Sequence, residues 1–175
     1  MLKENWEFNV LGIYNYQRDI QLKYYFDFII NHHREIDGDI LEAGVFRGKA
    51  LLGMALLLKK LGSKKKIYGF DTFSGFPPVY TPWDELSYFE EQLKQGIITE
   101  KHFAKIEKNK QIRSIQVKDL NKENISLSGD FGENSLQLLE KKIEFLGLEN
   151  VKLVKGDFSK TMSGRFDGSL CCVLF

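Results

Sequence analysis

Apolar and polar positions along the chain follow the alternation that a parallel β-sheet covered by helices requires. Short apolar runs bounded by glycine or charged residues predict the strands. These runs cover residues 39–43, 66–70, 151–154 and 169–175. Because segments of helical periodicity separate most of the runs, the pattern predicts an α/β fold in which helices cover a parallel sheet.

Helical periodicity is clearest in three segments. The first lies within residues 18–35, before the first strand, and predicts an amphipathic helix. The second starts after Gly48, is apolar along one side and stops at Gly62. The third lies within residues 134–147 and begins at an asparagine or serine cap. Together they supply the helices that a parallel sheet needs between its strands.

A long polar segment, residues 79–132, separates the second and third predicted strands. Connections in compact domains usually have about 4 to 6 residues, so this segment is more than a connector. Within it the pattern predicts helices over 82–93 and 99–108 and a strand-like alternation over 112–117. Two interpretations are equally open: a lid or wall of a substrate site, or an insertion that only decorates the surface.

Length and composition predict one globular domain over residues 1–175, with a helical segment over residues 1–37. The net charge of +1 gives no field that would attract nucleic acid. No apolar stretch approaches the roughly 20 residues of a membrane span, and the first residues lack the apolar region of a signal peptide, so a cytoplasmic location is expected. Cys171 and Cys172 are adjacent in an apolar run, which favours core packing over a disulfide or metal role.

The first predicted strand runs directly into a glycine-containing turn that opens a helix. Glycines let the backbone approach a ligand, and the free N–H groups at a helix start attract anionic groups. Glu42, just before the turn, would repel a dinucleotide pyrophosphate, and the spacing from Gly44 to Gly48 is not the GxGxxG of such sites. The turn is therefore expected to bind a small ligand with a cationic group.

Two further strand ends carry similar chemistry. Asp71 follows the second strand, where a carboxylate can accept hydrogen bonds from both ribose hydroxyls of a nucleoside, although an aspartate there is also a common cap or turn residue. Gly156, Asp157 and Phe158 follow the third strand, where Asp157 can accept from an adenine amine and Phe158 can pack on the ring. Carboxyl ends of parallel strands share one sheet edge, so adenosine with a cationic tail fits the three ends together.

These strand ends resemble the motifs of class I S-adenosylmethionine-dependent methyltransferases, and most closely those of the macrocin O-methyltransferase (TylF-like) family. The matching segments are residues 38–48, 70–77 and 150–161, and the similarity extends from Gly38 to Phe175. The resemblance implies an α/β fold of the class I methyltransferase type, a Rossmann-like parallel sheet with helices on both faces that is incomplete at the C-terminus. It also implies that Glu42 and Gly44 hold the methionine end of the cofactor. The residues expected to bind S-adenosylmethionine are Glu42, Ala43, Gly44, Val45, Phe46, Arg47, Gly48, Asp71, Thr72, Phe73, Gly156, Asp157 and Phe158.

The same resemblance implies an enzyme that methylates a sugar hydroxyl of a glycoside, polysaccharide or natural product. Arg47 would pair with the methionine carboxylate, or is an exposed structural arginine. Family members are similar in using aspartates and a divalent metal such as Mg²⁺ to activate the acceptor. Those residues follow the fourth strand in the family, so we expect the chain to be a fragment of a longer methyltransferase, with its metal ligands and catalytic base beyond Phe175.

Two other functions are compatible with the same residues. A non-catalytic cofactor-binding or assembly module would keep the pocket and complete its sheet with a partner. An NAD-dependent oxidoreductase would share the general fold, but Glu42 and the glycine spacing weaken that reading. A homodimer is expected from the sheet edge and from family similarity. Tyr14, Tyr16, Trp83 and His102 are assigned to the core or surface, with no catalytic role.

Overall fold

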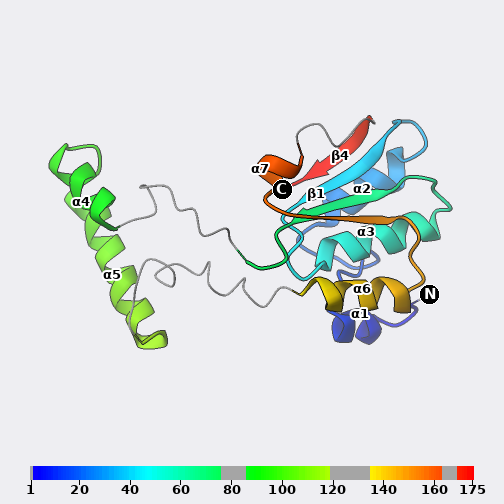
Figure 1. Ribbon diagram of the computed structural model, residues 1–175, viewed down its shortest axis with the longest axis horizontal. Coiled ribbons are helices and arrows are strands. Elements are labelled where there is room, and N and C mark those ends of the chain that lie inside the picture. Colours follow the sequence, from blue (N-terminus) through cyan, green and yellow to red (C-terminus); the bar gives the residue numbers. More distant parts are fainter. Residues whose placement is uncertain (1, 76–85, 119–134, 163–168) are drawn as a thin grey trace. The chain divides into compact units, whose positions relative to one another are not determined.

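The structure is a computed structural model that describes residues 2–75, 86–118, 135–162 and 169–175 (Figure 1). The chain divides into two compact units. One combines residues 1–73 with residues 134–175, and the other contains residues 74–133. The second unit includes the predicted insertion, whose role as a lid or a surface decoration stays a prediction.

The first unit is built on a parallel four-stranded sheet (Figure 1). Its strands are β1 (Asp39–Ala43), β2 (Ile67–Asp71), β3 (Val151–Lys155) and β4 (Leu170–Leu174). They lie in the order β3-β2-β1-β4 and every pairing is parallel. The four predicted strands are confirmed, with ends shifted by one residue where they differ. Because β1 and β2 are central, their carboxyl ends meet in the middle of one sheet edge.

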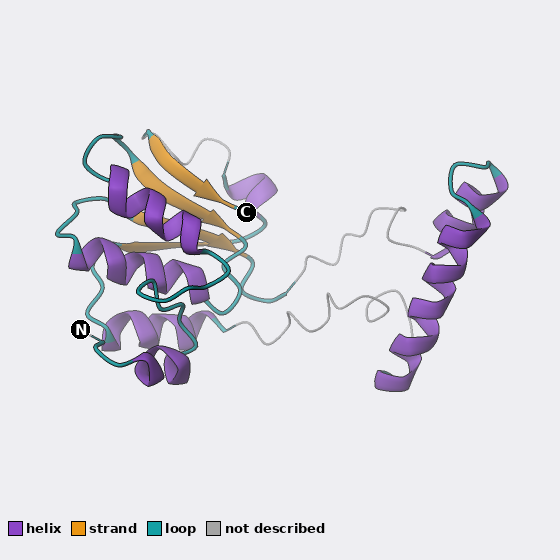
Figure 2. Cartoon of the chain, turned by 180° about the vertical axis from the view of Figure 1, so that it is seen from behind, coloured by secondary structure: helices purple, strands orange, loops and turns teal. Residues whose placement is uncertain are grey.

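In the described part of the chain, five helices belong to this unit and two to the second unit. The first unit contains α1 (Asn5–Leu11), α2 (Lys23–His32), α3 (Lys49–Lys60), α6 (Leu136–Phe145) and α7 (Phe158–Thr161). The second contains α4 (Leu86–Lys94) and α5 (Glu100–Gln116). Figure 2 shows α2 and α3 packed along one face of the sheet, as an α/β fold requires.

Side chains of β1 alternate between two cores, because successive residues of a strand point to opposite faces. Ile40 is buried in the larger core, which includes residues of α2, α3 and α6. Leu41 and Ala43 are buried in a smaller core on the other face, where Met162 packs beside them. Glu42 is two residues after Ile40, so its side chain lies on the same face of the sheet, which α2 and α3 cover.

The start of α3 depends on Gly48. Its φ of 75° lies in the left-handed region that side chains disfavour. A Cβ at this position would also collide with the Leu139 side chain of α6. Glycine therefore allows the turn after β1 and the close packing of α6 at the same residue.

Two sequence predictions differ from the structure. The strand-like alternation over 112–117 is wrong, because α5 continues to Gln116. Ile112 and Ile115 are also three residues apart, a helical spacing, and a helix already capped at Thr99 extends more easily than a new strand starts. The helix predicted within 18–35 is confirmed only over α2. Of the helix predicted over 82–93, residues 82–85 lie outside the described residues, as do Trp83 and the alternative cap Asn134.

Candidate functional site

The turn between β1 and α3 carries its backbone over the end of the neighbouring strand. The N–H of Gly44 donates to the carbonyl of Phe70 at 2.9 Å, and the N–H of Gly48 donates to the carbonyl of Val45 at 2.9 Å. Gly44 has a φ of 86°, and a Cβ added there would meet no atom within 4 Å. The turn thus presents open space at the carboxyl end of the sheet, beside the N-terminus of α3.

Asp71 ties this turn to the loop after β2. Its Oδ2 accepts from the N–H of Phe46 at 2.8 Å, and its Oδ1 accepts from the N–H of Phe73 at 2.7 Å. The side chain is 8% exposed. Phe46 and Phe73 both have positive φ values, 50° and 51°, which non-glycine residues rarely adopt. Asp71 therefore has the turn-stabilising role that the sequence left open, and its contact with ribose stays a prediction.

Glu42 is in a different situation from Asp71. It is 3% exposed, and its Oε2 is buried with no hydrogen-bond partner among the described residues. Burial, and then the nearby charge of Asp71, raise the pKa of Glu42 to about 8. A buried ionised carboxyl is costly unless a cation or several donors pair with it. A role of Glu42 in binding a positively charged group stays a prediction.

Glu42 opens onto a cavity of about 230 Å³. The cavity collects Glu42, Gly44, Val45, Phe46 and Arg47, which the sequence had predicted to bind one ligand. It also collects residues that the sequence did not predict: Tyr14, Leu22, Lys49, Ala50, Leu174 and Phe175.

The N-terminal segment supplies the least expected part of this wall. The N–H of Tyr14 donates to the carbonyl of Lys49 at 3.1 Å, and the Lys49 ammonium lies 5.1 Å from the centre of the Tyr14 ring. Leu22 is the residue that precedes α2. Only apolar spacing marks these residues in the sequence, and it does not distinguish a cavity wall from an ordinary core.

Arg47 is exposed at the mouth of the cavity, and its guanidinium carbon lies 5.1 Å from the centre of the Phe46 ring. The predicted residues Ala43 and Phe73 do not line the cavity, because both are buried in the hydrophobic cores. Thr72 is half-buried. The methionine-end residues are thus brought together, and the ribose-end residues adjoin them through Asp71.

The turn after β3 reaches the same sheet edge. The N–H of Gly156 donates to the carbonyl of Asp71 at 2.9 Å. Asp157 caps α7, where its Oδ1 accepts from the N–H and hydroxyl of Ser159 at 3.0 and 2.7 Å. These bonds lower the pKa of Asp157. Phe158 is 43% exposed. Neither side chain lines the cavity, and their contacts with adenine stay predictions.

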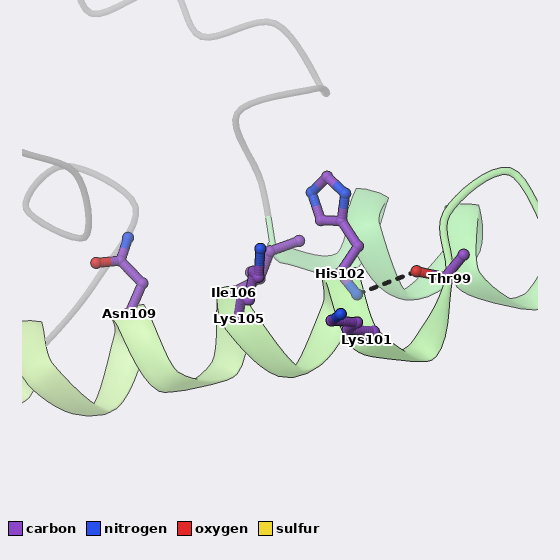
Figure 3. Close-up of a pocket in the computed structure, with 6 residues that line it drawn as sticks. All are labelled: Thr99, Lys101, His102, Lys105, Ile106 and Asn109. Carbon is purple, nitrogen blue, oxygen red and sulfur yellow. Dashed lines mark hydrogen bonds between the residues drawn. The ribbon is translucent and has the colours of Figure 1, made fainter.

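A separate hollow of about 510 Å³ lies on α5 in the second unit (Figure 3). Its lining residues are Thr99, Lys101, His102, Lys105, Ile106 and Asn109. None of them is a predicted cofactor residue. Among the described residues, no group of three or more His, Cys, Asp or Glu side chains is placed to hold a metal ion. Within the same ranges, no helix is both long and apolar enough to cross a membrane.

Comparison with known protein families identifies the family of the chain. The chain matches the family described as Macrocin-O-methyltransferase (TylF) over residues 15–149. It belongs to this family. The match begins next to Tyr14 and contains the whole turn from Glu42 to Gly48, together with Asp71. Methyltransferases of this family use S-adenosylmethionine, so family membership implies this cofactor.

The fold agrees with the family. The chain is similar to a solved structure described as that of the O-methyltransferase NovP, with a TM-score of 0.50 and 17% sequence identity. The similarity covers 84% of this chain and 48% of NovP, so the chain spans about half the length of that structure. No curated protein matches the chain. The predicted methyltransferase-type α/β fold is confirmed.

Proposed function

We propose that the chain forms the cofactor-binding part of an S-adenosylmethionine-dependent O-methyltransferase that acts on a sugar hydroxyl of a glycoside, polysaccharide or natural product. One observation carries the proposal beyond family membership. The unpaired, buried carboxyl oxygen of Glu42 borders a cavity whose other wall is the glycine turn. A pyrophosphate-containing dinucleotide would be repelled there, whereas an amino acid ammonium would be stabilised.

The residues of the cavity fit the amino acid end of this cofactor. Glu42 offers a carboxyl whose ionised form an ammonium group would stabilise, because a nearby cation offsets the burial that raises its pKa. The N-terminus of α3 and the exposed guanidinium of Arg47 offer positive potential to a carboxylate. Opposite charges are thus presented on two sides of one small space, a pattern that suits a zwitterion.

The other strand ends would bind the nucleoside. Asp71 lies next to the turn and would accept from the ribose hydroxyls, while Asp157 and Phe158 would contact the adenine. When bound, S-adenosylmethionine supplies an activated methyl group on its sulfonium. The protein's contribution is to position donor and acceptor, because such a displacement needs little covalent help. Tyr14 and Leu22 close one side of the cavity and would limit the access of water.

The proposal also includes the methyl acceptor and the way in which it is activated. A small-molecule or glycan hydroxyl must lose its proton during the transfer. Among the described residues, we assign none as the base that removes this proton. By similarity to the family, we expect aspartates that follow β4 to bind a divalent metal and activate the acceptor hydroxyl.

Isothermal titration with S-adenosylhomocysteine tests the cofactor assignment. The wild-type chain should bind this ligand and should not bind NAD. Glu42→Gln should weaken binding at least about tenfold, because it removes a charged hydrogen bond worth about 1.5–3 kcal/mol. Equal binding of NAD, or unchanged affinity in Glu42→Gln, would contradict the assignment.

Glu144→Gln is the matched control, because Glu144 is an exposed residue of α6 away from the cavity. It should bind S-adenosylhomocysteine as the wild type does. The acceptor class is tested separately by transfer of a labelled methyl group to macrocin, the compound in the family's name. Transfer to its sugar supports the proposed class, and binding of cofactor without transfer limits this chain to the cofactor role.

A further inference from the structure

Two buried polar atoms of the first unit have no hydrogen-bond partner among the described residues: Oε2 of Glu42 and the hydroxyl of Tyr25. In the part of the chain that the structure describes, Asn150 provides the one other such side-chain atom. Buried polar atoms nearly always have a hydrogen-bond partner in folded proteins, so two buried atoms without one call for an explanation. A hydroxyl and a carboxyl are complementary as donor and acceptor.

Both groups lie on the same face of the sheet. Glu42 shares this face with Ile40, and Tyr25 packs from α2 against the core that contains Ile40. In Figure 2, α2 lies across this face. The register places Cys172 beside Ile40 and Leu174 beside Glu42, so β4 borders the same space.

The pKa of Tyr25 is consistent with this placement. The pKa of Tyr25 is raised well above its ordinary value, first by burial and then by the charge of Glu42. The phenol therefore keeps its proton whenever Glu42 is ionised, and an O–H donor is always available on this side of the carboxyl. Tyr25 does not line the cavity, whereas Glu42 does.

We propose that Tyr25 is a positioning residue for Glu42. Its hydroxyl donates to the Glu42 carboxyl through one buried water molecule, and keeps that carboxyl turned toward the cavity and able to ionise when a cation arrives. A single water suffices, since water readily bridges two buried polar groups. That the cation is the cofactor's ammonium rests on the proposed function. The link between Tyr25 and Glu42 does not.

Other titratable groups lie on the elements around this space. They are Asp71 at the end of β2, Cys171 and Cys172 on β4, and Tyr14, Arg47 and Lys49 around the cavity. Of these, Asp71 disfavours the ionised Glu42 carboxyl. None of them belongs to α2, so a variant at Tyr25 leaves them in place.

Carbon-13 NMR titration of the ligand-free chain tests the proposal. The Glu42 side-chain carboxyl should titrate near pH 8 in the wild type. In Tyr25→Phe, which keeps the ring and its packing, the midpoint should rise by about half a unit or more, because one donor to the ionised form is lost. Tyr24→Phe is the matched control on the same helix: Tyr24 is 89% exposed, and its variant should leave the midpoint unchanged.

The wild-type chain provides a test that needs no substitution. With the tyrosine ring carbons next to oxygen labelled, the Tyr25 signal should shift at the same pH as the Glu42 carboxyl. If Tyr25→Phe fails to fold, this measurement decides. A Tyr25 signal without a step at that pH, or an unchanged Glu42 midpoint in a folded Tyr25→Phe chain, would overturn the proposal.

Ligand binding distinguishes positioning from general packing. At pH 7, Tyr25→Phe should bind S-adenosylhomocysteine about fivefold more weakly than the wild type. The pH above which affinity stops rising should also move upward. In a Glu42→Gln background the same substitution should not lower the affinity for S-adenosylhomocysteine further, since the carboxylate is absent. An equal loss in both backgrounds would mean that Tyr25 acts through packing, and the proposal would be wrong.

Failure of the proposed function gives a different pattern. If the wild-type chain does not bind S-adenosylhomocysteine while the NMR titrations behave as expected, the cofactor assignment fails and the Tyr25–Glu42 link stands. If the chain binds the ligand and the titrations are insensitive to Tyr25, the cofactor assignment stands and the Tyr25–Glu42 link fails.

Discussion

The turns after β1 and β3 look alike in the sequence and differ in the structure. Each places glycine and a carboxylate at the carboxyl end of a parallel strand. Glu42 is buried with one oxygen unpaired, and its pKa is raised to about 8. Asp157 is solvated and accepts two hydrogen bonds from Ser159, which lower its pKa.

The difference separates a carboxylate that needs a partner from one that already has its own. The Asp157 side chain accepts a hydrogen bond from the first turn of α7, as helix caps do. Asp71 lies between these cases, because it is buried but accepts from two backbone N–H groups. Glu42 alone among these three retains a buried, unsatisfied oxygen, and it is the one that borders a cavity.

The largest expected effect concerns stability against pH at Glu42. Its pKa is raised from 4.5 to about 8 on folding, so the folded chain holds a proton that the unfolded chain has lost. Stability from this group is therefore fully present below about pH 4.5 and falls as pH rises toward about 8. Because each unit corresponds to about 1.4 kcal/mol, the decline should reach several kcal/mol. Urea unfolding of the wild type and Glu42→Gln across this range measures it.

In Glu42→Gln this contribution is absent, so the variant should overtake the wild type in stability as the pH approaches 8. Glu144→Gln should retain the wild-type profile, because Glu144 is solvent-exposed. A parallel pH profile for wild type and Glu42→Gln would show that Glu42 titrates normally, and its contrast with Asp157 would disappear.

Asp71→Ala should give the next largest effect. It leaves the N–H groups of Phe46 and Phe73 without their acceptor and releases the turn after β1 from the loop after β2. Hydrogen bonds to charged groups contribute about 1.5–3 kcal/mol each, so a loss of about 3 kcal/mol is expected. Urea unfolding at pH 7 measures it. A loss too small to detect would mean that the backbone at these two residues is held by other contacts.

Asp157→Ala should have the smallest effect of the three. The substitution removes an exposed cap from a four-residue helix, and water can satisfy the N–H and hydroxyl of Ser159. The urea midpoint should shift by little more than the error of the measurement. A loss as large as that of Asp71→Ala would overturn the distinction between the two turns.

Much of the fold could be predicted from local patterns. The apolar runs identified all four strands, and glycines and caps identified where α3, α5 and α6 begin. The extent of α5 could not be predicted, because the alternation from Ile112 to Val117 is too short to separate a strand from a helix. Of the site, the turn from Glu42 to Gly48 was found, whereas Tyr14 and Leu22 were not.

The sequence by itself determined which residue types stand at the strand ends, because period, glycine and cap signals are local and act within a few residues. Only the tertiary structure decided which carboxylate is satisfied. Phe46 donates to Asp71 across 25 positions of the chain, and Tyr25 packs against the core that contains Ile40 from a helix that precedes β1. Burial and hydrogen-bond partners come from these long-range contacts, and they set the charge that each carboxyl can carry.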